Sequence, residues 1–426
     1  MSQKINSILS QALQQVEPSK EDLKLINDSL KDFKQKLESE IKKKNIKAQV
    51  FVGGSVAKGT LIKKNKYDAD AFLRFDKKYQ EENISDIAKK LLKNFKNVST
   101  IHGSREYFKI SITPGFYIEL VPVIKVANPQ QSQNITDLSY SHVNYIRKKI
   151  KSKKTLDEIR LAKAFCYAHH CYGAESYIQG FSGYALELLV YNYKSFLSFL
   201  KAMVKIKSKQ VIDIEKHYKN KSQVLLDLNS SKLHSPIILI DPTYKQRNAL
   251  AALSEETLKE FQKAANKFLK SPSIKQFELQ KTDLKQIKKQ AKKNKNQFIF
   301  LEAKTNKQEG DIAGSKLLKF YNHLAEELKK FFDIKNKGFN YNETKSAKYF
   351  FVAKPKKDIL CSGPFIKDKK HARGFKNQHK KTFIKKSRIY AKEKAPNNLK
   401  TFILSWREKN SIRIKEMYIL GLKVLE

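Results

Sequence analysis

Two hydrophobic periods follow each other in the first part of the chain. Between Ser19 and Lys44, apolar residues recur at three- and four-residue steps, which predicts a helix that Ser19 caps. Alternate apolar residues from Ile46 to Val52 then predict a half-buried strand, which Gly53-Gly54-Ser55 ends. Further strands are predicted at Asp68–Phe75, Tyr107–Thr113 and Phe116–Val126. These elements predict a small mixed sheet with helices on one face.

From His142 onward the periodicity becomes helical. Helices are predicted at Asp157–Tyr172, Tyr184–Val204 and Ser254–Leu269, and a short apolar strand followed by a loop is predicted at Leu233–Asn248. After Pro272 both periods occur, and the pattern predicts strands at Phe298–Ala303 and Tyr349–Ala353, a helix at Ser315–Phe332 and a basic helix at Asp368–Lys386. The expected fold class is therefore α/β in front, α in the centre and α+β at the end.

The charge balance favours a polyanionic partner. The chain has 86 Lys and Arg residues against 42 Asp and Glu residues, a formal net charge of +44 in 426 residues. Basic side chains near phosphates release condensed counterions, so nucleic acid is the natural partner. A general compositional bias toward lysine is the alternative, so charge alone suggests nucleic acid without proving it.

Composition also bears on where the protein works. Cys166, Cys171 and Cys361 are too few and too scattered for a disulfide framework or a zinc site, which favours a reducing compartment. The most apolar stretch, Tyr184–Val204, is interrupted by charged residues, so we interpret it as core rather than as a membrane span. With no signal-peptide pattern at the start, these features predict a soluble, cytoplasmic protein without a membrane partner.

Two aspartates two positions apart suggest metal chemistry. Residues i and i+2 of a strand face the same side, so Asp68 and Asp70 project together. Two neighbouring carboxylates stay ionised when a cation lies between them, and Mg²⁺ prefers oxygen ligands. Glu119 is the candidate third carboxylate, because it stands on an otherwise apolar strand face. A solvated strand end is the alternative explanation of the aspartate pair.

Upstream of the pair lies a candidate phosphate cradle. Gly54 allows a close backbone approach, and Ser55 offers a hydroxyl at the start of a helical turn. Lys58 follows one turn later and can add a cation to the same phosphates.

The segment Gly53–Phe75 resembles the polymerase-β-type nucleotidyltransferase superfamily, whose signature is Gly-Ser, a gap and Asp-x-Asp, with a later acidic residue on a neighbouring strand. Val56–Tyr67 fill the gap in this chain. Downstream segments resemble the archaeal-type (class I) CCA-adding enzymes, and these are DLSYSH (137–142), DEIRLAKAF (157–165), the GFSGY turn with its helix (180–202), IDPTYKQRN (240–248) and the C-terminal run 363–391.

The resemblance implies roles for individual residues. It implies triphosphate binding by Ser55 and Lys58 and metal binding by Asp68, Asp70 and Glu119, although relatives usually have Arg at position 58 and Asp at position 119. Further implied contacts to the nucleotide are made by Ser139, where Thr is common, by His142, Lys163 and Tyr172 for the phosphates and sugar, and by Arg247 for the base. From the residues alone, Lys163 is equally a snorkelling lysine, His142 a packing histidine, Tyr172 a core residue and Arg247 a surface residue.

The implied function is template-independent addition of C, C and A to the 3′ end of tRNA from CTP and ATP, with Mg²⁺ as cofactor. The implied domains are a catalytic domain at 1–147, a helical domain completing the nucleotide pocket at 148–270, and a tRNA-binding body and tail at 271–426. His371, Arg373, Lys376 and Lys380 of the basic helix are expected to contact tRNA, at its acceptor stem and elbow, and the family suggests a homodimer. The alternatives are a poly(A)- or oligoadenylate-forming enzyme of the superfamily and a non-catalytic tRNA-binding relative.

Overall fold

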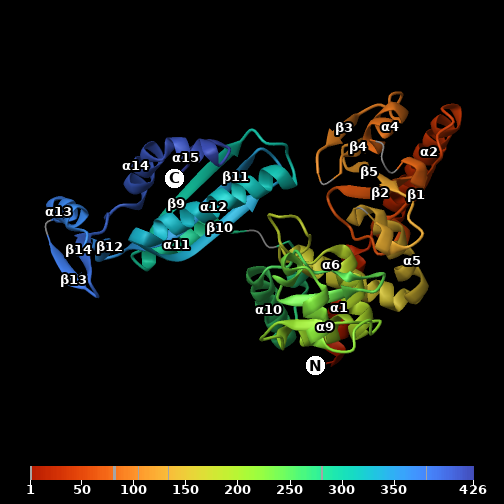
Figure 1. Cartoon of the computed structure of the whole chain (residues 1–426). Coiled ribbons are helices and arrows are strands. Elements are labelled where there is room, and N and C mark those ends of the chain that lie inside the picture. The colour runs from red at the N-terminus through yellow and green to blue at the C-terminus, as the bar shows by residue number, and fades with distance from the viewer. Residues whose placement is uncertain (1, 80–82, 104, 133, 280–281, 380) are drawn as a thin grey trace. The chain divides into compact units, whose positions relative to one another are not determined.

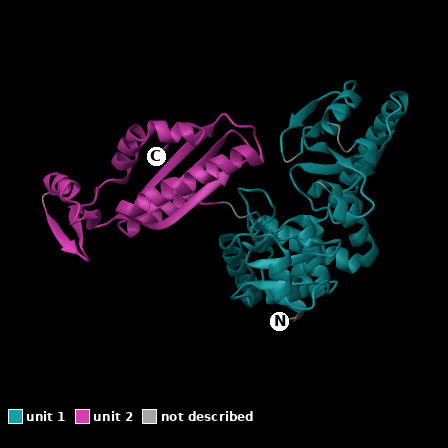
Figure 2. Cartoon of the chain, in the orientation of Figure 1, with its two compact units in different colours: residues 1–280 teal, residues 281–426 magenta. Residues whose placement is uncertain are grey.

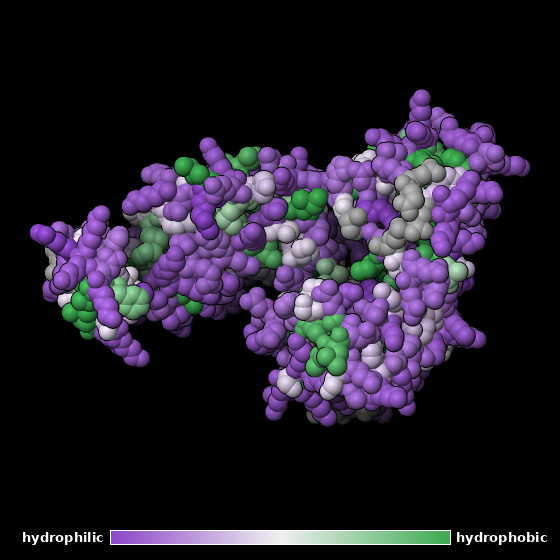
Figure 3. Space-filling view, viewed as in Figure 1, coloured by the Kyte–Doolittle hydropathy of each residue, from purple (hydrophilic) through white to green (hydrophobic). Residues whose placement is uncertain are grey.

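The chain forms two compact units, residues 1–280 and residues 281–426 (Figure 2). The structure is a computed structural model that describes residues 2–79, 83–103, 105–132, 134–279, 282–379 and 381–426. A membrane-spanning helix is absent from these described residues. The face shown in Figure 3 is mostly hydrophilic, with separate small apolar areas.

The first sheet has five strands in the order β1-β2-β5-β4-β3 (Figure 1). Their bounds are β1 Ala48–Val52, β2 Tyr67–Phe75, β3 Val98–Ile101, β4 Tyr107–Thr113 and β5 Phe116–Ile124. The predicted strands are confirmed. The central pair β2 and β5 is parallel, and the other neighbours are antiparallel.

One face of this sheet is covered by two helices, α2 (Lys20–Lys43) and α4 (Ile84–Leu91). The alternate β2 residues Ala69, Ala71, Leu73 and Phe75 pack in the same hydrophobic cluster as these helices. Asp68, Asp70, Phe72 and Arg74 therefore project from the opposite face. We call this the catalytic face, because the predicted catalytic residues Asp68 and Asp70 lie on it.

Helix α2 begins as its sequence predicts. Ser19 Oγ accepts a hydrogen bond from the backbone N–H of Asp22 at 3.0 Å, which satisfies a donor of the first turn. Helix α4 and strand β3 were not predicted, because each is too short for a clear periodic pattern.

The second part of unit 1 is mainly helical and packs around clustered phenylalanines, Phe165, Phe181, Phe196, Phe199, Phe261, Phe268 and Phe277. Its helices are α5 Ser139–Lys149, α6 Lys153–Ala168, α7 Gly183–Tyr193, α8 Phe196–Val204, α9 Lys221–Asp227 and α10 Glu255–Lys270. The first helix, α1 (Ser2–Val16), contributes Ala12 and Val16 to this cluster rather than to the sheet's core. The predicted boundary at 147/148 stays a prediction.

The single helix expected at Tyr184–Val204 is wrong, because the segment forms two helices. Lys194 ends α7 with φ 71° in the left-handed region, and Ser195 caps α8 by accepting a hydrogen bond from Ser198 N at 3.1 Å. A serine hydroxyl that competes for backbone groups favours such a break. The segment Leu233–Asn248 also differs, because its expected loop contains β8 (Tyr244–Asn248), paired with β7 (Ile237–Asp241), which in turn pairs with β6 (Gln210–Ile212).

Unit 2 has a four-stranded sheet in the order β10-β11-β9-β15 and a three-stranded sheet in the order β12-β14-β13. The strands are β9 Gln297–Thr305, β10 Phe332–Tyr341, β11 Ser346–Pro355, β12 Asp358–Phe365, β13 Thr382–Lys385, β14 Arg388–Lys394 and β15 Ile419–Val424, and the helices are α11 Leu284–Lys293, α12 Asp311–Phe331, α13 Lys369–Gln378, α14 Leu399–Lys409 and α15 Ser411–Glu416. The helix predicted at Asp368–Lys386 is too long, because α13 ends at Gln378 and 382–385 form β13.

Candidate active site

Asp70 lies directly against the glycine turn that follows β1. Gly53 N donates to Asp70 O at 2.8 Å, which fixes the turn on strand β2. Gly54 has φ +61°, and a Cβ at this position would lie 1.7 Å from Asp70 Oδ2. Only glycine fits both the backbone conformation and the carboxylate. The sequence Gly-Gly-Ser thus brings a backbone turn into contact with a carboxylate from β2.

The aspartate pair needs a cation. Burial, followed by the charge of Asp68, raises the pKa of Asp70 from 3.8 to about 6, although Lys58, Lys64 and Lys163 act in the opposite direction. Asp68 lies 3.4 Å from Lys64 Nζ. The lysines of the chain therefore compensate the pair only in part, and a divalent ion would remove the remaining repulsion. The residues present fit a metal ion held by two carboxylates and by substrate phosphates, as is common for Mg²⁺.

Glu119 stands opposite Asp70 on the neighbouring strand. The register of β2 and β5 pairs Asp70 with Glu119 and Asp68 with Tyr117, so Glu119 is on the catalytic face. No group of three His, Cys, Asp or Glu side chains that could hold a metal occurs among the described residues. Metal binding by Glu119 therefore stays a prediction.

Helix α3 (Gly54–Lys58) carries the other predicted phosphate-binding groups. Ser55 lies in its first turn and Lys58 in its last, and Gly59 ends it with φ 68°. Lys58 does not project freely into solvent. Its Nζ lies 2.6 Å from Glu187 Oε2 on α7.

Glu187 joins two predicted phosphate-binding lysines. Its Oε1 accepts hydrogen bonds from Lys163 Nζ at 2.8 Å and from Thr60 Oγ1 at 2.7 Å. Lys163 Nζ also donates to Thr60 Oγ1 at 2.7 Å. Glu187 has no exposed surface, and Lys163 is 1% exposed. The structure therefore places Lys58 and Lys163 together through a buried acid that the sequence analysis did not identify.

The charges of this cluster do not cancel. Burial by itself would raise the pKa of Glu187, but the lysines overcome this effect and lower it to about 2. Burial lowers the pKa of Lys163 to about 8, despite the attraction of Glu187. Two cations face one ionised carboxylate, so the cluster favours an additional anion such as a phosphate.

A second buried acid, Asp241 at the end of β7, joins two other predicted residues. Its Oδ2 lies 2.8 Å from His142 Nε2 and 2.7 Å from Arg247 NH1. Tyr184 OH donates to Oδ1 at 3.0 Å, and the His142 and Tyr184 rings stack with centroids 4.1 Å apart. Burial lowers the pKa of His142, so the neutral ring is favoured even beside Asp241.

Tyr172 lies between the carboxylate pair and the lysine cluster. Burial raises its pKa, and the charges of Asp68 and Glu187 add to the shift. A Cβ at Gly183 would lie 3.0 Å from the Tyr172 hydroxyl and 3.6 Å from Lys163 Nζ. Ser139 is the first residue of α5, the helix that also bears His142.

Sequence reasoning missed Glu187, Thr60 and Asp241. The signal for the two acids was present, because each is a carboxylate within an otherwise apolar run, Tyr184–Val190 and Ile237–Asp241. Such residues are rarely buried without a partner. Most of their partners lie far away in the sequence, and the contact of Lys58 with Glu187 spans 129 positions, although Arg247 is only six positions from Asp241.

The predicted tRNA-binding residues lie on α13 in unit 2. His371, Arg373 and Lys376 are exposed, while Ala372 is buried. His371 Nδ1 lies 2.7 Å from Asp368 Oδ2 at the start of the helix. Lys380 lies outside the described residues.

Two family models match this chain. One is described as "tRNA nucleotidyltransferase, second domain" and matches residues 157–278. The other is described as "Second Messenger Oligonucleotide or Dinucleotide Synthetase domain" and matches residues 3–159. Together they cover the two parts of unit 1 that supply the aspartates, the lysines and Glu187.

Curated relatives with one shared name match the chain in sequence. The CCA-adding enzyme of Nanoarchaeum equitans is 45% identical over 207 residues, 48% of this chain and 51% of that protein. The CCA-adding enzyme of Methanocaldococcus jannaschii is 26% identical over 399 residues, 91% of this chain and 87% of that protein. The chain thus spans about half the length of the first relative in their match, and most of the second.

A solved structure shows the same fold. The RNA terminal uridylyl transferase Cid1 superposes with a TM-score of 0.51 at 13% identity, covering 66% of this chain and 99% of that chain. The expected architecture, a polymerase-β-type nucleotidyltransferase sheet followed by helical and α+β parts, is confirmed by the observed elements and by this likeness.

Proposed function

We propose, from its similarity to archaeal CCA-adding enzymes, that this chain is an archaeal-type (class I) CCA-adding enzyme that builds the 3′ CCA end of tRNA from CTP and ATP. The observation that carries this proposal is the contact of Asp70 with the Gly54 turn. It brings a candidate metal ligand and a candidate triphosphate-binding turn into one place, in a chain whose relatives are CCA-adding enzymes.

The proposed reaction is attack of the RNA 3′-hydroxyl on the α-phosphate of the nucleotide, with release of pyrophosphate. Nucleotidyltransferases of this superfamily generally use divalent metal ions, and we propose Mg²⁺, held by Asp68 and Asp70 with Glu119 as a further ligand. When bound, the ions activate the attacking hydroxyl and neutralise charge on the pyrophosphate.

The protein's own residues would bind and orient the nucleotide. Lys58 and Lys163 supply positive charge for the triphosphate, Ser55 a hydroxyl in the first turn of α3, and Tyr172 a hydroxyl between the two clusters. Ser139 and His142 of α5 are proposed as further contacts to the nucleotide.

Arg247 is the proposed reader of the base. Its guanidinium is held by Asp241 at 2.7 Å, which fixes the direction of its remaining donors. The same carboxylate orients His142 at 2.8 Å, so one acid positions two proposed nucleotide contacts.

The basic face of α13, with His371, Arg373 and Lys376, is the proposed contact to the acceptor stem and elbow of tRNA. Duplex RNA is recognised mainly through its backbone and shape, so exposed cations suffice there. We further propose that the enzyme works in the cytoplasm and that it is a homodimer. Light scattering of the purified protein would test the homodimer.

A nucleotide-omission assay tests the function. tRNA lacking its three terminal nucleotides is incubated with CTP alone, with ATP alone, or with both. We expect extension by two nucleotides with CTP, none with ATP, and three with both. A ladder of many A residues would instead identify a poly(A)-forming enzyme, and no incorporation with any metal would identify a non-catalytic RNA-binding protein.

A further inference from the structure

Arg74 is a buried cation on the catalytic face of the first sheet. It follows Asp70 by four residues on β2, so both side chains leave the strand on the same side, about 13 Å apart along it. Only 7% of its surface is exposed. Within the described part of the chain it forms no ion pair with a carboxylate, and burial lowers its pKa. A desolvated charge of this kind is costly until an anion meets it.

An aromatic side chain covers the guanidinium. Arg74 Cζ lies 3.6 Å from the ring centroid of Tyr140, which is the second residue of α5. Phe51 of β1 contacts the same tyrosine edge to face, with centroids 4.9 Å apart. Tyr140 is 37% exposed. A stacked guanidinium keeps its N–H donors at its edge, where a phosphate binds, and an exposed aromatic ring can support an RNA base.

The position of Arg74 relative to the glycine turn determines which ligand it faces. The turn contacts Asp70, and Arg74 lies further along β2, away from it. In a nucleotidyl transfer the attacking oxygen and the leaving pyrophosphate are in line on opposite sides of the α-phosphate. With the pyrophosphate at the turn, the RNA strand that brings the 3′-hydroxyl approaches from the side of Arg74.

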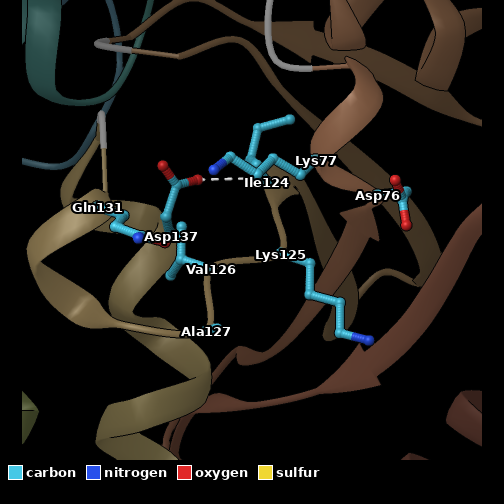
Figure 4. A pocket seen from close by; sticks show the side chains of 8 residues that line it. All are labelled: Asp76, Lys77, Ile124, Lys125, Val126, Ala127, Gln131 and Asp137. Carbon is cyan, nitrogen blue, oxygen red and sulfur yellow. Dashed lines mark hydrogen bonds between the residues drawn. The ribbon is translucent and has the colours of Figure 1, made fainter.

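A cavity of about 350 Å³ lies where β2 and β5 end (Figure 4). Asp76 follows β2 and Lys125 follows β5, and Lys125 N donates to Phe75 O at 2.8 Å, which extends the pairing of the two strands. Lys77 and Lys125 line the cavity. Its buried acid, Asp137, is already engaged by Arg105 and by Ile124 N at 3.0 Å. The cavity thus offers two further cations, Lys77 and Lys125, next to the ends of β2 and β5.

We propose that Arg74 and Tyr140 form a subsite for the single-stranded 3′ end of the acceptor RNA. Arg74 binds a backbone phosphate upstream of the terminal nucleotide, and Tyr140 stacks on an adjacent base. This inference rests on the proposed function, because it assumes that an RNA 3′ end is the attacking substrate.

Steady-state kinetics of single CTP addition by the full chain provide the first test. For Arg74→Gln and Tyr140→Leu, we expect the KM for acceptor RNA to rise about tenfold or more, since a charge-assisted hydrogen bond or a base stack is lost. The KM for CTP should change less than twofold. Arg74→Lys, which keeps a cation, should have a KM for acceptor RNA between those of the wild type and Arg74→Gln. It replaces Arg74→Gln in the test if that variant does not fold. Lys89→Gln, at an exposed position of α4, is the charge-matched control and should match the wild type.

The second test uses acceptor RNAs in which one phosphate linkage is replaced by an uncharged methylphosphonate. The affinity of each RNA for the wild type and for Arg74→Gln is measured without added nucleotide. One linkage near the 3′ end should weaken binding to the wild type about tenfold and leave binding to Arg74→Gln unchanged. Equal sensitivity of both proteins at every linkage would overturn the subsite, as would an equal rise of both KM values. Because binding is measured without incorporation, this outcome is separate from a failure of the nucleotide-omission assay.

Discussion

Two acidic side chains of the candidate site have pKa values that are shifted in opposite directions. Asp70 is held against Gly54 with a pKa of about 6, and Glu187 is held between lysines with a pKa of about 2. Both are acids in buried surroundings, but one faces another carboxylate and the other faces ammonium groups. Burial favours a higher pKa at both acids, and Asp68 adds to this effect at Asp70, whereas the lysines reverse it at Glu187.

Asp70→Asn is expected to stabilise the metal-free protein and to abolish nucleotide incorporation. A carboxyl whose folded pKa exceeds its unfolded value binds its proton more tightly in the folded state. Stability therefore falls as pH rises from 3.8 to about 6, and the cost above pH 6 is on the order of 3 kcal/mol. Thermal unfolding at pH 7 without metal should show a Tm several degrees higher for the variant. A lower Tm together with near-normal incorporation would contradict both roles.

Glu187→Gln is expected to destabilise the protein at neutral pH and to flatten its acid response. The folded pKa of Glu187 is depressed, so its stabilisation is present above about pH 4.5 and is lost as pH falls toward 2. Removing the acid leaves two buried cations, which costs about 3 kcal/mol. Unfolding by urea between pH 2 and 7 measures this dependence. The exposed Glu256→Gln is the control, and an equal pH slope in both variants would count against the ionised cluster.

Among the elements, the break between α7 and α8 separates the helix that carries Glu187 from the helix that follows it. If the segment formed one straight helix, its two halves would share one axis. Instead Lys194 turns the chain in the left-handed region and Ser195 starts α8 on a new axis. The break lets both helices bury apolar side chains in the phenylalanine cluster while α7 carries Glu187 to Lys58 and Lys163.

Lys194→Gly is expected to stabilise the protein by about 0.5 kcal/mol. Glycine adopts a positive φ without the clash that a Cβ causes, although the variant loses the contact of Lys194 with the Tyr191 ring at 4.6 Å. Lys201→Gly, at an exposed position inside α8, should instead cost about 1 kcal/mol. Calorimetry measures the free energy of unfolding of both variants and of the wild type. A loss of stability in both variants would show that the left-handed turn carries no strain.

For the complete chain, charge is the dominant property. A net charge of +44 predicts tRNA binding that weakens steeply with salt. Arg373→Gln or Lys376→Gln should each reduce the slope of log K against log[salt] by about 1 if the side chain contacts a phosphate. Lys319→Gln, on the exposed side of α12, is the matched control. The affinity for tRNA is measured at several salt concentrations for each variant. If Arg373→Gln and Lys376→Gln keep the wild-type slope, as Lys319→Gln should, α13 does not contact the tRNA phosphates.

Local patterns predicted much of the fold. The period-two alternation placed β1 correctly, and a capping serine with apolar residues at helical spacing placed α2. Period alone failed at Tyr184–Val204, where apolar residues continue through a break made by backbone conformation. It also failed for α4 and β3, which are too short to show a period.

The sequence by itself determined the aspartate pair and the need for glycine before it, since two residues on one strand share a face whatever surrounds them. Only the tertiary structure decided which acid joins the two lysines, which acid orients His142 and Arg247, and that Arg74 is buried against Tyr140 without a described carboxylate partner. Except for Asp241 and Arg247, these contacts join residues far apart in the chain, and a side chain's charged partners depend on which elements pack together.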